Sequence, residues 1–262
     1  MWRGGGGDPD AGPPLAGAGA LDAAVEAEFI DTDGMVRREL LSRCWSVAFE
    51  RVSPVRGFAS FRGQRNRPGL WWFASTGELV SHESWVERDV LMALDADPGV
   101  EAVASQPMWL HWVSESGKAR RHAPDLFVRR ADGSGVLVDV RPDHLVRAAD
   151  RVVFAATAVM AGLAGWAYER VGELPAVRAA NLRWLAGYRH PRYARAAVMA
   201  ALEEVFAEPG PLRAGAARVG DPVAVLPVLF AMLWRGALAA DLDSRVLDSV
   251  STVRAAGEGA GS

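Results

Sequence analysis

Acidic residues in the middle of the sequence have types and spacings that suit a metal site. In residues 82–95 the apolar residues recur at helical spacing, and Glu83 and Glu87 fall on the same helix face as them. Asp125 and Asp139 lie in two segments with strand-like alternation. Carboxylates on faces that should be buried are costly unless another charge compensates them. The pattern therefore predicts a bound divalent cation, and oxygen ligands favour Mg²⁺ or Mn²⁺.

The second of these strand-like segments adds a positive charge to the predicted site. Alternation in residues 136–141 places Leu137, Asp139 and Arg141 on one face. A tight turn at residues 132–135 brings Asp125 within about two residues of the position opposite Arg141. A metal ion there would activate a water molecule and neutralise a phosphate, and a nearby cation would stabilise the charge that develops. These residue types thus suit hydrolysis at a phosphate.

The elements that must position these residues predict an α/β fold. The spacing of apolar residues predicts helices over residues 82–95 and 144–162, and strands over residues 108–113, 122–130, 135–142 and 166–171. Because a helix connects the last two strands, they should be parallel, in a mixed sheet with helices on both faces. On the first helix, Arg88, Asp89 and Asp95 are expected to point toward water. Residues 35–80 are expected to be irregular.

The rest of the chain predicts two tails and a second domain. Residues 1–20 and 255–262 contain few large apolar groups, so both are expected to be disordered. Residues 21–174 are predicted to form the first domain, and residues 175–254 are predicted to form a mainly helical or winged-helix domain. Helices are expected in this second domain over residues 176–185, 191–206 and 222–238, with a short strand or wing within 241–253.

Composition limits the classes of protein to consider. The formal net charge is −3, so contact with DNA would depend on local clusters of arginine rather than on the overall charge. A single cysteine, Cys44, excludes an intramolecular disulfide and any zinc site built from several cysteines. The sequence has neither a signal-peptide pattern nor an uninterrupted apolar stretch of membrane-spanning length. A cytoplasmic protein without membrane association is expected.

The predicted metal site carries a recognisable motif. Pro124-Asp125 followed by Asp139-Val140-Arg141 resembles the PD-(D/E)xK nuclease motif, with arginine in place of lysine. The predicted order of a helix with a glutamate, three strands, a helix and a further strand also resembles the restriction-endonuclease-like core of that superfamily.

The resemblance implies roles for individual residues. Glu87, Asp125 and Asp139 would bind the metal, together with the carbonyl of Val140, and Arg141 would be the catalytic cation. Glu83 lies one turn before Glu87 and is the alternative helix carboxylate, although we favour Glu87. Because arginine stays protonated, Arg141 cannot act as a general base.

Longer segments narrow the resemblance to one family. Three stretches within residues 60–195 are similar to TnsA, the endonuclease subunit of heteromeric transposases: Glu83-Ser84-Trp85-Val86-Glu87-Arg88-Asp89, Asp97-Pro98-Gly99-Val100 with Gln106-Pro107, and His122-Ala123-Pro124-Asp125-Leu126-Phe127. Two later stretches resemble actinobacterial members of that family: Asn181-Leu182-Arg183-Trp184-Leu185 and Tyr188-Arg189-His190-Pro191-Arg192. The resemblance implies a nuclease that cuts the 5′ ends of a mobile element, with a separate transposase subunit and an ATPase regulator as partners.

Further residues are candidates for supporting roles. His122 is expected either to hydrogen-bond a metal ligand or to be structural. Basic residues lie near aromatic ones in two places. Arg62, Arg65 and Arg67 suit contact with double-stranded DNA or a loop whose aromatic residues cap the core equally well. Arg183, Arg189 and Arg192 suit contact with DNA or a solvated helix face equally well. Two alternatives to the transposase subunit stay open at this point, namely a catalytically weak or inactive adaptor with the same fold, and a standalone restriction or repair nuclease.

Overall fold

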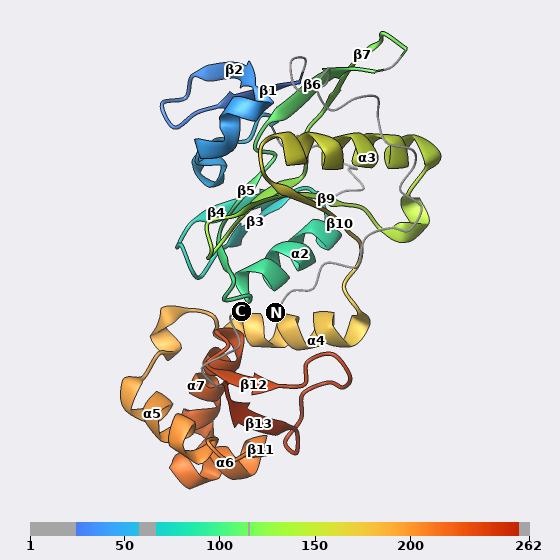
Figure 1. The fold of residues 1–262 in the computed structure, drawn as a ribbon. Helices are drawn as coiled ribbons and strands as arrows, with labels where there is room; N and C mark the ends of the chain where they lie inside the picture. Colours follow the sequence, from blue (N-terminus) through green and yellow to red (C-terminus); the bar gives the residue numbers. More distant parts are fainter. Residues whose placement is uncertain (1–24, 58–66, 115, 257–262) are drawn as a thin grey trace.

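The chain forms a mixed α/β fold around a central four-stranded sheet. The computed structural model describes residues 25–57, 67–114 and 116–256. The strand order of the central sheet is β10–β9–β8–β5 (Figure 1), formed by β5 Val100–Ser105, β8 Leu126–Arg130, β9 Gly135–Val140 and β10 Ala167–Val171. β8 and β9 are antiparallel, and the crossover through α3 Ala148–Leu163 makes β10 parallel to β9. The predicted hairpin and the predicted parallel pair are therefore confirmed.

Two helices cover opposite faces of this sheet (Figure 1). Helix α2, Trp85–Asp95, packs its buried apolar residues with the valines of β9, which point to one side. Helix α3 packs on the other side, where Leu137 and Phe127 lie. A short 3-10 turn, Asp143–Leu145, precedes α3. Alternation along β9 thus separates two apolar layers, as the sequence predicted.

The segment predicted as one strand over residues 122–130 is instead two strands in different sheets. β7 Ala119–His122 pairs with β6 Trp109–Val113, whereas β8 begins at Leu126. Pro124 lies between them, and proline has no amide hydrogen to donate to a sheet ladder. Because of this break, Asp125 lies just before the first residue of β8, at the end of the sheet where a site can form.

The N-terminal part contains more regular structure than the sequence predicted. A second four-stranded sheet has the order β2–β1–β6–β7, with β1 Glu26–Ile30 and β2 Val36–Leu40. Within residues 35–80, expected to be irregular, lie β2, two 3-10 helices at Leu41–Ser46 and Phe49–Arg51, and the hairpin of β3 Gly69–Trp72 and β4 Leu79–His82. Strand β5 was also not predicted.

The C-terminal part is mainly helical with a small sheet. Its elements are α4 Ala176–Leu185, 3-10 turns at Ala186–Tyr188 and Pro191–Tyr193, α5 Ala196–Val205, β11 Gly210–Pro211, α6 Leu212–Val219, α7 Pro222–Trp234, β12 Leu238–Ala240 and β13 Thr252–Ala255. The helix predicted over 191–206 is interrupted before α5. β13 extends to Ala255, so the predicted tail begins too early, while residues 1–20 and 257–262 lie outside the described residues.

One apolar core continues from the central sheet into the C-terminal part. Val90 and Leu91 of α2 belong to the same buried cluster as Leu182 of α4 and Val228 of α7. The predicted domain boundary coincides with Pro175, the N-cap of α4, but the two halves share this core. Among the described residues no single helix is long and apolar enough to span a membrane, and α6 with α7 reaches that length only as a pair bent by 118°.

Candidate active site

Asp125 and Asp139 face each other at one end of the central sheet. Leu126 pairs with Val138, which places Asp125 opposite Asp139, within the predicted two residues of the position opposite Arg141. The amide of Val140 donates a hydrogen bond of 2.8 Å to Oδ2 of Asp125. Burial raises the pKa of Asp125 well above its ordinary value, and the negative charges of Asp139 and Glu87 raise it further. A cation at this position would relieve that repulsion.

Both oxygens of Asp139 accept hydrogen bonds. The carboxylate is buried, at 2% exposure. Its Oδ1 lies 2.8 Å from Nε2 of His122, and its Oδ2 accepts from the hydroxyl of Tyr168 at 2.9 Å. Each carboxylate oxygen has a second lone pair, so these contacts leave room for a metal ligand bond. His122 therefore lies where a group that orients a ligand is needed.

Tyr168 is a part of this site that sequence reasoning missed. It lies on β10 opposite Leu137 of β9. Leu137 is two residues before Asp139, so the side chains of Tyr168 and Asp139 lie on the same face of the sheet. Burial and the charge of Asp139 raise the pKa of its hydroxyl, so it remains a hydrogen-bond donor. The predicted parallel pairing of β9 and β10 could have indicated Tyr168, because side chains alternate between faces along a strand and this register puts Tyr168 and Asp139 on one face.

Glu87 caps its own helix as well as facing the acids. Oε1 accepts a hydrogen bond from the hydroxyl of Ser84 and Oε2 accepts from the amide of Glu83, both at 2.8 Å, while the amide of Glu87 donates to the hydroxyl of Ser84 at 3.2 Å. This arrangement is a variant of the capping box that Ser84-Trp85-Val86-Glu87 signals in the sequence, because the glutamate accepts from the amide of Glu83 and the hydroxyl of Ser84. Burial is the main cause that raises the pKa of Glu87. Glu87 is therefore both a structural residue and a helix carboxylate whose charge helps to raise the pKa of Asp125.

The other acids of α2 are buried, contrary to the expectation that they face water. Asp89 and Asp95 are each 8% exposed. Asp89 pairs with Arg88 at 2.6 Å and also with Arg183 of α4. Asp95 accepts from the indole of Trp71 at 3.0 Å and from the amide of Ala74 at 2.8 Å. Partners from β3 and α4, which helical periodicity alone does not reveal, cover these two sides of the helix.

Arg141 turns toward helix α3. Its one ion pair within the described residues joins Nη2 to Oδ2 of Asp150 at 3.7 Å, and its side chain is 40% exposed. Its Nε is buried without a hydrogen-bond partner. The alternation that places Arg141 on the face of Asp139 is compatible with this direction, because α3 covers that face. The structure thus brings Asp125, Asp139, Val140 and His122 together and holds the Arg141 guanidinium beside Asp150.

A different arginine, Arg56, lies close to the acids. Its Nη2 is 3.5 Å from Oε2 of Glu83, and its positive charge lowers the pKa of both Glu87 and Asp125 against the effect of burial. Its backbone position follows from two hydrogen bonds: Val55 donates to the carbonyl of Gln106, and Gln106 donates to the carbonyl of Asp125. The sequence shows Arg56 only as a member of an arginine-rich stretch, since no local pattern connects it to Asp125.

Gln106 has an unusual backbone beside the same carboxylates. It is the single non-glycine residue with positive φ in the described part of the chain, at 44°, and it precedes a proline. Residues before proline normally keep an extended backbone. Gln106 is 2% exposed, and its Oε1 is buried without a hydrogen-bond partner. Such strained, incompletely bonded residues tend to occur at functional sites.

The arginines predicted to bind DNA have different environments. Arg62 and Arg65 lie outside the described residues, whereas Arg67 and Arg192 are exposed. Arg183 pairs with Asp89 across the junction of the two halves. Arg189 lies 4.3 Å from the ring centre of Trp71 and donates to the carbonyl of Ala186 at 2.6 Å. Arg189 is therefore half-buried and covers the buried carboxylate of Asp95, 3.9 Å away.

The residue types at this site suit a hard metal ion, but their side chains are not arranged around a single point. Among the described residues no group of three or more His, Cys, Asp or Glu side chains is arranged to hold a metal. Asp125 and Asp139 are adjacent carboxylates with oxygen ligands that Mg²⁺ and Mn²⁺ prefer. For Glu87 to join them, its carboxylate would have to share its capping contacts. Glu83 is engaged with Arg56 instead.

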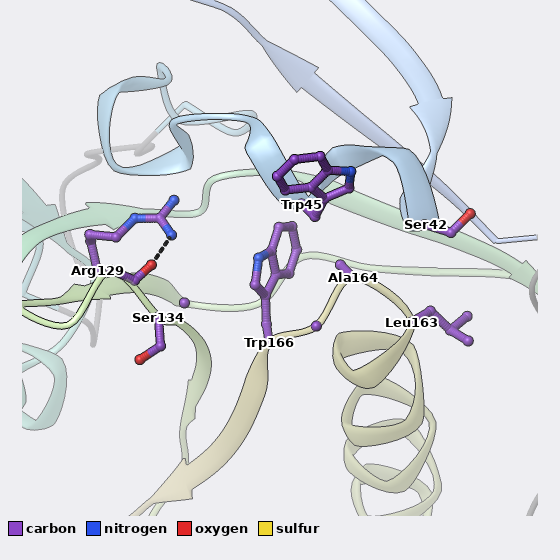
Figure 2. A pocket seen from close by; sticks show the side chains of 10 residues that line it. Ser42, Trp45, Arg129, Ser134, Leu163, Ala164 and Trp166 are labelled. Carbon is purple, nitrogen blue, oxygen red and sulfur yellow. Dashed lines mark hydrogen bonds between the residues drawn. The ribbon is translucent and has the colours of Figure 1, made fainter.

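A separate pocket lies at the other end of the β8–β9 hairpin. It has a volume of about 420 Å³ and is lined by residues around the hairpin turn and the start of β10, including Trp45, Gly133 and Trp166. Figure 2 shows Trp45 above Trp166, with Arg129 hydrogen-bonded at 2.9 Å to the carbonyl of Gly133. The hairpin separates this pocket from the acids, so it is not part of the candidate site.

Comparison with known proteins gives no family for this chain. No model of a known protein family matches the sequence, and a search of curated proteins also found no match. The site itself therefore carries the functional proposal.

Proposed function

We propose that the protein is a Mg²⁺-dependent DNA endonuclease, the subunit of a heteromeric transposase that hydrolyses phosphodiester bonds at the 5′ ends of a mobile element. The observation that carries this proposal is the opposed pair of Asp125 and Asp139, with a raised pKa at Asp125 and with Glu87 close enough to contribute to it. A buried carboxylate, Asp139, next to the half-buried carboxylate of Asp125 is unfavourable without a cation.

The order of elements supports a restriction-endonuclease-like core. A helix with a glutamate, α2, precedes the antiparallel strands β5, β8 and β9, with β6 and β7 of the second sheet inserted between β5 and β8. The crossover helix α3 then leads to the parallel strand β10. Asp125 precedes β8 and Asp139 is the penultimate residue of β9, so both acids lie at the same end of the sheet. This is the placement that the PD-(D/E)xK resemblance implies.

Some residues of the site would bind the metal ion, and others hold these ligands in place. Asp125, Asp139 and Glu87 would hold Mg²⁺ or Mn²⁺, with the carbonyl of Val140 as a further ligand. The bound ion would supply the activation of water and the neutralisation of phosphate charge. His122 and Tyr168 fix the orientation of Asp139, and the Val140 amide fixes that of Asp125. Ligands held in this way need little rearrangement when the substrate binds.

The C-terminal half supports the partner-binding part of the proposal. Its elements follow the order α5, β11, α6, α7, β12, β13, and the three strands form one sheet. Three helices with a small antiparallel sheet in this order are typical of a winged-helix domain. This domain would bind DNA or the partners, which are the separate transposase subunit and the ATPase regulator, in the cytoplasm.

A non-catalytic adaptor is the second candidate, and the position of Arg141 favours it. The guanidinium is paired with Asp150, and Glu87 is engaged in its capping box. An adaptor would use the same fold to bind DNA without cutting it. A protein that cleaves only after the substitution Arg141→Lys would be such an adaptor.

Cleavage of DNA that carries the element end tests the proposal. The purified protein is incubated with Mg²⁺ or Mn²⁺, alone and with its partner transposase, and the products are mapped to the nucleotide. We expect cuts at the 5′ ends that depend on the metal and on the partner. Cutting without any partner would favour a standalone nuclease. No cutting with all partners present, together with intact transposition by Asp125→Ala, would end the nuclease proposal.

A further inference from the structure

Arg56 occupies the position where a phosphate-binding cation is needed, and the inference drawn from it rests on the proposed nuclease function. Its Nη2 approaches Glu83 at 3.5 Å, and Glu83 donates its amide to Glu87 at 2.8 Å. The backbone bonds from Val55 to Gln106 and from Gln106 to Asp125, of 2.9 and 2.8 Å, place the start of the Arg56 side chain beside the same sheet end. Arg56 is thus the arginine that adjoins both the helix acids and the strand acids.

The guanidinium of Arg56 has donors to spare. A guanidinium carries five N–H donors, and the ion pair with Glu83 at 3.5 Å is longer than a hydrogen bond between charged groups normally is. Its Nε is buried without a hydrogen-bond partner, while 37% of the side chain is exposed. Because Nε is buried, an acceptor that arrives from outside would meet the terminal NH2 groups, for which Glu83 is the one ion-pair partner among the described residues.

An aromatic ring helps to orient this side chain. The guanidinium carbon of Arg56 lies 5.8 Å from the centre of the Trp109 ring, and that of Arg121 lies 4.4 Å from the same ring. Contacts between cations and an aromatic face favour a defined orientation of the guanidinium. Two arginines at one tryptophan also concentrate positive charge on this side of the acids, which suits a polyanion.

We propose that Arg56 binds the DNA phosphate next to the metal site and stabilises the negative charge that develops on it during cleavage. The guanidinium would donate to the non-bridging oxygens, for which its planar fork is well shaped. Arg141 also has an unpaired Nε, but its guanidinium pairs with Asp150, away from Glu87 and Glu83. Arg56 thus supplies the cation that the motif places at Arg141.

Single-turnover cleavage of a duplex with the element end, with Mg²⁺ and the partner transposase present, tests this role. We expect Arg56→Gln to lower the rate about 100-fold, as the loss of a donor to a developing oxyanion does. Arg56→Lys should recover part of the loss, because it restores the charge without the fork. Arg43→Gln is the matched control: Arg43 is an exposed arginine in the 3-10 helix that lines the distant pocket, and its loss should change the rate less than about twofold.

Two further measurements separate phosphate binding from a structural role. Thermal unfolding of Arg56→Gln should resemble that of the wild type, and Glu83→Gln, which removes the ion pair but keeps Arg56, should lower the rate far less than Arg56→Gln. An equal loss in Glu83→Gln would show that Arg56 acts through Glu83 and would overturn the inference. Wild-type cleavage with an equally fast Arg56→Gln would overturn it while leaving the nuclease intact. A wild type that cuts nothing would overturn both.

Discussion

At the scale of single residues, Glu87 combines two roles that one substitution separates. Its carboxylate receives hydrogen bonds from Ser84 and from the amide of Glu83, and its charge contributes to the raised pKa of Asp125. Glutamine serves in a capping box as glutamate does. In Glu87→Gln the side-chain oxygen can still accept from the amide of Glu83, and the NH2 group can donate to the hydroxyl of Ser84, so the substitution keeps the helix end bonded and removes the charge that a metal ligand needs.

We expect Glu87→Gln to unfold at nearly the wild-type temperature and to cleave DNA about 100-fold more slowly, a loss of about 2.7 kcal/mol of transition-state stabilisation. Ser84→Ala is the matched control, because it removes the N-cap hydroxyl and should cost about 1 kcal/mol of stability. Thermal melts and single-turnover rates measure both variants. A Glu87→Gln protein that is destabilised but cuts at the normal rate would limit Glu87 to capping.

Local patterns predicted part of the site. Hairpin register and alternation placed Asp125 within about two residues of the position opposite Arg141, and the structure places it opposite Asp139, inside that range. The same patterns did not reveal Tyr168 or Arg56, because their contacts depend on how distant segments meet. They also could not give the direction of the Arg141 side chain, which Asp150 on the covering helix determines.

At the scale of elements, α2 shows how neighbours override a helical pattern. The pattern placed Asp95 toward water, but β3 covers it with the indole of Trp71 and Arg189 approaches it from the C-terminal half. The helices α2 and α3, the hairpin and the parallel strand were predictable from strong periodicity. Strand β5 was missed because three of its six residues are Ala or Ser, which have weak strand preference. The break at Pro124 has a local cause that the sequence displays.

The buried Asp95 should make stability depend on pH. Burial raises its pKa from 3.8 to about 6. The folded state therefore holds this proton more tightly than the unfolded state, so the contribution of Asp95 is complete below about pH 4 and is lost as the pH rises through about 6. We expect Asp95→Asn to reduce the decline in the free energy of unfolding between about pH 4 and about pH 7 by about 3 kcal/mol relative to the wild type.

Urea unfolding at both pH values, for the wild type and Asp95→Asn, measures this difference. The comparison uses the change with pH in each protein, because the substitution also alters the hydrogen bonds from Trp71 and Ala74. Other carboxyl groups with raised pKa values, such as Glu169, are present in both proteins and cancel. An identical pH dependence in the two proteins would contradict the assignment to Asp95.

At the scale of the whole molecule, the two halves depend on each other. Leu182 and Leu185 of α4 are buried in the same cluster as Val90 and Leu94 of α2. The ion pair between Arg183 and Asp89 crosses the same junction. Composition and periodicity predicted a boundary near Pro175. They could not predict a shared core, because the apolar face of a helix has the same sequence pattern whichever part of the protein covers it.

We expect a protein that ends at Leu174 not to fold stably. Truncation would expose the α2 side of the core, and each large apolar side chain uncovered costs about 1.5–3 kcal/mol. Urea unfolding followed by circular dichroism should show one cooperative transition for residues 25–256 and none for the truncated protein. A cooperative transition in the fragment would mean that the halves are independent domains.

The central claim is that Asp125 and Asp139 form a metal-dependent cutting site, and the cleavage rate of bound DNA tests it most directly. The rate is measured for the wild type and Asp125→Asn in Mg²⁺, with the partner transposase present and both proteins saturated with the same element-end DNA. Asparagine keeps an oxygen for the Val140 amide, so the fold should persist. We predict metal-dependent 5′-end cleavage by the wild type and a rate at least about 100-fold lower for Asp125→Asn. Equal rates in the two proteins, or no cleavage by the wild type, would contradict the account.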